Sequence, residues 1–180
     1  PISTSVSQQY PQVSCTTSDV TASADILQIA ADVRDQLTPL LQLGSNWRFP
    51  VNIHIIAPED PLTGKVRHES VSVVAADGTL KIWAFLPSND PNAREFIQRQ
   101  FVTALLWEKF FPKKQTFDTQ TRLDIVPTWL IEGLREWLND DPEHDRASIV
   151  RRATQLQLAP TLDEITSWRE VSDDRLLGLW

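Results

Sequence analysis

The chain has 180 residues, a formal net charge of −7 and an ordinary globular composition, with 41% hydrophobic and 23% charged residues. This length predicts a single domain with its own hydrophobic core. The acidic balance argues against a general nucleic-acid binder, because phosphate groups are neutralised by a basic face. One cysteine excludes an internal disulfide framework and any multi-cysteine zinc site. No apolar run reaches the roughly 18 residues that a membrane-spanning helix needs.

Residues 1–22 are rich in Ser, Thr and Gln, almost uncharged, and without a hydrophobic period. Such a composition is typical of a linker, so we expect a flexible arm here, followed by one domain over residues 23–180. The first residue is not methionine, which indicates a processed or trimmed product. A polar leader of this kind is common after a removed signal peptide and therefore favours an exported protein.

The first half of this predicted domain combines a helix with three strands. Apolar residues at three- and four-residue steps predict a helix that begins at Ser23 and stops at Gly44. The hydrophobic period then changes to two, and an Asp-Gly pair gives a strong hairpin signal. The predicted strands are residues 51–55, 68–75 and 79–86.

The second half is predicted to be helical. A helix begins near Pro91 and ends before Pro112, and its middle, residues 101–107, is apolar almost all round. Such a helix is enclosed on most sides, so we expect it at the centre of the domain. The fold class is therefore α+β, with a small three-stranded sheet lobe packed on a mainly helical lobe. The remaining predicted helices are residues 127–138, residues 143–157 and a short one from Thr161.

The most informative stretch is Pro127-Thr-Trp-Leu-Ile-Glu-Gly-Leu134, in which Gly133 lies inside a predicted helix. A glycine there costs about 1 kcal/mol relative to alanine and usually allows another backbone to approach closely. This stretch resembles the helix of gluzincin metallopeptidases, in particular the peptidase MA-like group, that supplies the third zinc ligand as a glutamate. The order of elements over residues 23–170 is also similar. The resemblance implies a gluzincin-like fold in which Glu132 holds the ligand position.

The resemblance also implies a central helix with the sequence His-Glu-x-x-His, which supplies two zinc ligands and the general base. The best matching pentapeptide here is TALLW at residues 103–107, and no histidine lies between His68 and His144 to restore the motif. Catalytic zinc needs three protein ligands, so we expect no metal or other cofactor and no peptidase activity. We expect the Trp107 side chain to fill the zinc position. The vestigial positions are Thr103, Ala104, Trp107 and Glu132.

These observations predict a non-catalytic, peptidase-like domain that binds a protein, a peptide or a cell-envelope component. The binding site would be a groove between the sheet edge and the central helix, where a peptide could add as a further strand. The candidate groove residues are His54, Trp107, Trp129 and Glu132.

Two other functions stay open. Residues 171–180 resemble the start of a helix and end on apolar Leu179 and Trp180, which suggests a truncated parent chain or a segment that docks in an assembly. A monomer would favour the binding module, and a defined oligomer would favour a structural subunit. An enzyme would require a zinc site completed by other residues or by a partner chain.

Ordinary structural roles compete with the site interpretations. Glu108 is expected to pair with a nearby lysine (Lys109, Lys113 or Lys114) rather than to act as a displaced base. Glu132 could form an ion pair with Arg135, three residues further along the helix. His144 is expected at a solvated helix start.

Overall fold

The computed structural model describes residues 2–44, 46–56, 68–88, 90–113, 116–118, 121, 123 and 126–139. The chain divides into two units, Pro1–Leu138 and Asn139–Trp180, and every element below belongs to the first. The helices are α1 (Val20–Leu41), α2 (Ala93–Phe110) and α3 (Thr128–Leu138). The strands are β1 (Ser3–Val6), β2 (Val13–Thr17), β3 (Val51–Ile56), β4 (Glu69–Val74) and β5 (Leu80–Pro87).

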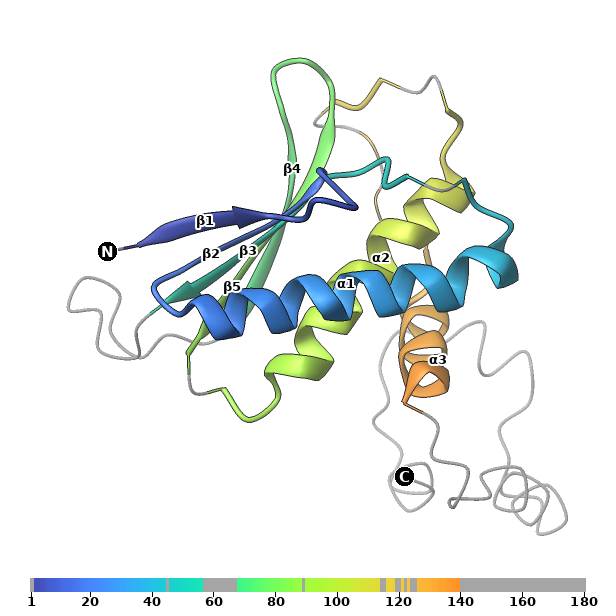
Figure 1. Ribbon diagram of the computed structural model, residues 1–180. Helices are drawn as coiled ribbons and strands as arrows, with labels where there is room; N and C mark the ends of the chain where they lie inside the picture. Colours follow the sequence, from blue (N-terminus) through green and yellow to red (C-terminus); the bar gives the residue numbers. More distant parts are fainter. Residues whose placement is uncertain are drawn as a thin grey trace, which may run out of the picture. The chain divides into compact units, whose positions relative to one another are not determined.

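The strands form one mixed sheet in the order β1-β2-β3-β5-β4 (Figure 1). The three middle strands run parallel to one another, whereas the edge strands β1 and β4 each run antiparallel to their neighbour. The parallel pair β2 and β3 is joined through α1, as a parallel connection requires a crossover. The hairpin of β4 and β5 turns at Gly78, whose φ of +74° is a conformation that favours glycine.

The predicted three-stranded sheet is wrong, because the sheet has five strands. The two further strands, β1 and β2, lie within residues 1–22, which their polar composition led us to predict as a flexible arm. In β2, Val13, Cys15 and Thr17 alternate with exposed or half-buried residues, and all three are buried. Only Val13 and Cys15 of this period are apolar and the third buried side chain is a threonine, so the hydrophobic pattern is too short to indicate a strand. The α+β class itself is compatible with the structure.

The core lies between the helices and one face of the sheet. Val13, Val51 and Ile82 are neighbours in register across β2, β3 and β5, and all three are buried. Helix α1 contacts β2, and α2 contacts β3 and β5 (Figure 1). The middle of α2 is enclosed, as predicted from its apolar sequence, because it also contacts α1 and α3. No helix within the described ranges is long and apolar enough to cross a membrane.

Helix α1 starts earlier than predicted. Asp19, not Ser23, is the N-cap, and its carboxylate accepts hydrogen bonds from the backbone N–H groups of Thr21 and Ala22. Ser23 is buried one turn inside the helix. The additional turn brings the start of α1 directly after β2, which leaves only a short link between the two elements.

Candidate functional site

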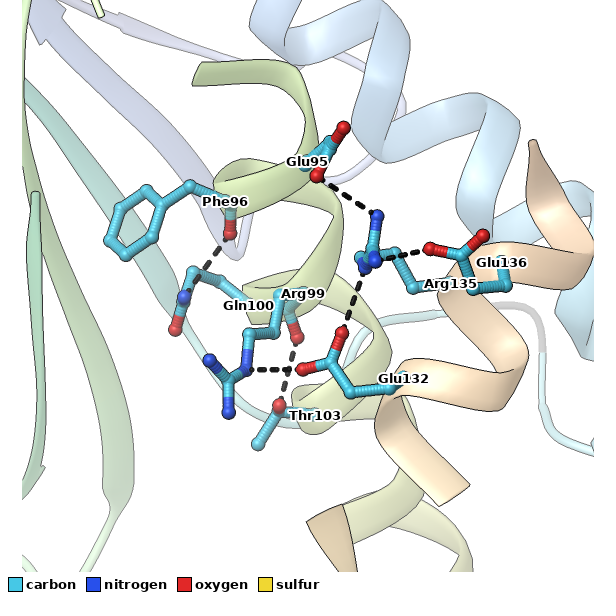
Figure 2. A network of polar contacts seen from close by, with 8 residues as sticks. All are labelled: Glu95, Phe96, Arg99, Gln100, Thr103, Glu132, Arg135 and Glu136. Atoms are coloured by element: carbon cyan, nitrogen blue, oxygen red, sulfur yellow. Dashed lines mark hydrogen bonds and ion pairs between the residues drawn. The ribbon is translucent and has the colours of Figure 1, made fainter. Parts of the chain in front are cut away.

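An ion-pair cluster joins α2 to α3 around the carboxylate of Glu132 (Figure 2). One carboxylate oxygen lies 3.1 Å from Nε of Arg99 on α2, and the other lies 2.9 Å from Nε of Arg135 on α3. Both oxygens of Glu132 are therefore held by guanidinium groups, which keep the carboxylate in a fixed place at the interface of the two helices. The pair with Arg135 is the ordinary helical ion pair that the sequence left open.

Arg135 is the hub of the cluster. Its guanidinium also pairs with Glu95 of α2 at 3.2 Å and with Glu136 of its own helix. Although burial lowers the pKa of Arg135, the hydrogen bond to Glu132 and the nearby carboxylates raise it, and the net pKa lies above the ordinary value. Arg135 therefore stays charged. The ion-pair cluster consists of Glu95, Arg99, Glu132, Arg135 and Glu136.

The helix positions next to Glu132 differ from the predicted pentapeptide 103–107 by one turn. Arg99 contacts Glu132 directly, and Thr103 follows it at i+4 on the same side of α2, with its hydroxyl donating to the Arg99 carbonyl at 2.8 Å. The pentapeptide that begins at Arg99 and ends at Thr103 is Arg-Gln-Phe-Val-Thr.

Ala104 and Trp107 belong to the core. Both are buried, and the Trp107 ring meets the Phe49 ring edge to face at a centroid distance of 5.9 Å. Through Phe49, which also contacts Phe111, the Trp107 ring packs among the aromatic residues near the end of α2. The space next to Glu132 is occupied by Arg99 instead.

The four residues predicted to line one groove lie in three different settings. Trp107 is in the core, whereas Trp129 and Glu132 are on α3, where the Trp129 side chain is exposed. His54 is on β3, on the sheet face opposite the helices, because its neighbour Ile53 faces the core. Its ring stacks on those of Trp83 and Phe85, each at 5.1 Å, and burial lowers its pKa.

Within the described residues Glu108 pairs with neither Lys109 nor Lys113, contrary to the prediction of a lysine partner; Lys114 lies outside the described residues. The Glu108 side chain is only 5% exposed and accepts hydrogen bonds from Arg34 of α1 at 2.9 Å and from the backbone N–H of Arg48 at 2.7 Å. Arg34 also donates to the carbonyl oxygens of Gly44 and Asn46. The reason is that α1 packs against the side of α2 that carries Glu108. This carboxylate therefore ties two helices and a loop together and has a structural role.

The free edge of β4 is a second feature with binding potential, and the sequence analysis did not identify its side chains. Among the described strands β4 pairs only with β5, so its outer edge carries no sheet partner. Val71 and Val73 on β4 are 42% and 39% exposed, and Trp83, which pairs with Val71 across the strands, is 39% exposed. These three side chains form an exposed apolar strip beside the edge, on the face away from the helices.

Other predicted features are placed as follows. His68 pairs with Asp90, three residues before the start of α2, at 3.0 Å. No group of three or more His, Cys, Asp or Glu side chains in the described part of the chain could hold a metal ion. His144, the predicted helices after residue 142 and the apolar segment 171–180 lie outside the described residues.

Comparison with family models, curated proteins and solved structures found no match to this chain.

Proposed function

We propose that this chain is a pseudopeptidase, a peptidase-like domain without a zinc site, that binds an extended segment of a protein or peptide partner along β4. The proposal has two parts: the loss of chemistry at Glu132 and the gain of a binding role at the sheet edge. The observation that carries the first part is the ion pair between Glu132 and Arg99.

The side chains around Glu132 do not fit a zinc ion. Arginine stays protonated in proteins and offers only donors, so Arg99 at the position of the first histidine cannot be a metal ligand. A divalent cation next to Glu132 would have to displace Arg99 and would be repelled by Arg135, which contacts the other carboxylate oxygen. Gln100, at the position of the general base, donates from its side-chain amide to the Phe96 carbonyl and cannot accept a proton from water as a carboxylate does.

The edge of β4 supports a binding role. An open strand edge offers backbone N–H and C=O groups to another strand, and natural edges are usually protected by charges, proline or bulges. β4 has the sequence ESVSVV, with one charge at its start and no proline. A partner that adds in register would place alternate apolar side chains against Val71, Val73 and Trp83. The partner is therefore an extended peptide segment with apolar residues at every second position.

The first experiment tests the register at Glu132 by creating a metal site. The triple variant Arg99→His, Gln100→Glu, Thr103→His should bind one zinc ion, measured by calorimetry and metal analysis, and should lose it when Glu132 is also replaced by alanine. A double variant in the other register, Thr103→His with Trp107→His, is the matched control and should not gain this site. Stoichiometric zinc bound through Glu132 in the unaltered protein would contradict the proposal.

The second experiment tests whether a peptide binds along the outer edge of β4. Synthetic peptides of ten residues with alternating apolar positions are screened for binding, and the affinity of the best is measured again on Val71→Lys and Val73→Lys variants. Each lysine should weaken binding about tenfold or more, because it places a charge in the apolar strip. Val6→Lys, on the opposite edge strand and 52% exposed, is the control. Equal losses in all three variants would show that the peptides do not add to β4.

A further inference from the structure

A cavity of about 500 Å³ lies between the first half of α1, the start of α2 and the ends of β3 and β5. None of its lining residues belongs to the ion-pair cluster or to the apolar strip of β4. It is therefore a separate feature, at the carboxyl ends of two parallel strands, where open sheets commonly bind small ligands.

The floor of the cavity is apolar. Helix α1 contributes Ile26 and Ile29, the two strands contribute Ile55 and Leu86, and α2 contributes Ile97. Ile26, Ile29, Leu86 and Ile97 are buried members of the core and fix the shape of the floor by packing, so the apolar surface that a ligand can cover comes mainly from half-buried Ile55, Pro87 and Ala93. A ligand that covers this floor must present an aliphatic or aromatic group.

The walls of the cavity carry opposite charges. Asp25 and Asp32 line it from α1, and Arg94 lines it from the first turn of α2. Asp32 accepts a hydrogen bond from Gln28 at 2.7 Å, but across the described ranges neither Asp25 nor Arg94 forms an ion pair. The two helices thus present a carboxylate and a guanidinium to one apolar cavity without neutralising each other.

We propose that this cavity binds a short peptide with free termini and at least one large apolar side chain. The ammonium group would lie at Asp25 and Asp32, the carboxylate would accept a bidentate pair of hydrogen bonds from Arg94, and the side chain would cover the apolar floor. The volume is within the range of about 300–1,000 Å³ typical of small-ligand sites. Opposite charges on separate helices favour a ligand whose own charges are separated, as the termini of a peptide are.

The test uses the full chain and the dipeptide Leu-Leu, with binding followed by calorimetry and by amide chemical shifts. We expect saturable binding, with shifts concentrated on α1 and the start of α2. The acetylated and amidated form of the same dipeptide lacks both charges and should bind at least about tenfold more weakly, since charge-assisted hydrogen bonds are the strong ones.

Single substitutions test which charged side chains of the cavity bind the dipeptide. Arg94→Gln and Asp25→Asn should each weaken binding about tenfold or more, whereas Lys109→Gln at the far end of α2 and Glu69→Gln on β4 should not. Thermal unfolding of each variant checks that the fold is kept. The proposal is overturned if Leu-Leu does not bind at about 10 mM, if the capped form binds as well, or if the two cavity variants match their controls. None of these outcomes affects the proposal for β4, whose peptides are tested on different variants.

Discussion

Replacing Glu108 by alanine should destabilise the fold far more than an ordinary surface substitution. Its carboxylate accepts from Arg34 and from the backbone of Arg48, and the Arg34 side chain is only 1% exposed. Without Glu108, a guanidinium would stay buried next to α2 with no counter-charge. Arg34 keeps its bonds to two carbonyl oxygens and its position over the Trp47 ring, but these partners are neutral.

The magnitude follows from the cost of an uncompensated buried charge. Breaking a buried ion pair by removing one partner costs about 3–5 kcal/mol, while the whole free energy of unfolding of a domain is about 5–15 kcal/mol. Glu108→Gln keeps an oxygen that can accept both hydrogen bonds and loses only the charge, so we expect a smaller loss of about 1–3 kcal/mol. Replacing both partners, Arg34→Met with Glu108→Leu, should recover much of the stability that Glu108→Ala loses.

Urea unfolding followed by circular dichroism measures these differences at constant pH. Glu69→Ala, at an exposed position on β4, is the control and should change the free energy of unfolding by less than about 0.5 kcal/mol. If Glu108→Ala lowered stability no more than this control, Glu108 would not be the counter-charge of Arg34, and its assigned structural role would be refuted.

Two further predictions concern glycines and pH. Gly133→Ala should stabilise the protein by about 1 kcal/mol, because a Cβ there meets nothing within 4 Å. Gly78→Ala should destabilise it by about 1–3 kcal/mol, because the φ of Gly78 is +74° and the Cβ would lie 2.6 Å from Thr116. Urea unfolding measures both changes in the free energy of unfolding, and the opposite sign for either one would contradict its prediction. Burial lowers the pKa of His54 below the ordinary 6.5, so near this pH the folded protein binds fewer protons than the unfolded chain. The free energy of unfolding should therefore keep its full contribution from His54 above that pH and decrease as the pH falls below it. His54→Phe keeps a ring between its neighbours and should flatten this dependence; an unchanged slope in the variant would assign it to other groups.

The elements with strong local signals were predicted well. The predicted helices that begin at Ser23, Pro91 and Pro127 correspond to α1, α2 and α3, and the hairpin at Asp77-Gly78 joins β4 to β5. Each of these rests on a hydrophobic period, a cap or a turn residue that acts within a few positions along the chain. Such local signals determine whether a segment forms a helix or a strand, but they do not determine which other elements it packs against.

The contacts that the sequence did not predict join segments that are far apart along the chain. β2 is held by parallel pairing with β3 on the far side of α1, and nothing in its short polar sequence indicates that partner. The contact between Glu132 and Arg99 was not predicted, for a related reason. The apolar period of α2 shows which residues are buried, but not that Arg99 forms an ion pair with Glu132 of α3. A charged residue with its partner on another helix can be recognised only once both helices are placed.

The parallel pairing of β2 with β3 also sets an order of events during synthesis. Cys15 pairs with Ile53 in register, so β2 leaves the ribosome long before the strand that it must pair with. Until β3 and α1 are both made, the apolar side chains of β2 have nothing to pack against, and contacts between such distant segments form slowly. β2 is thus without its parallel partner while α1 is being made, and the nascent chain is vulnerable to misassociation over that interval.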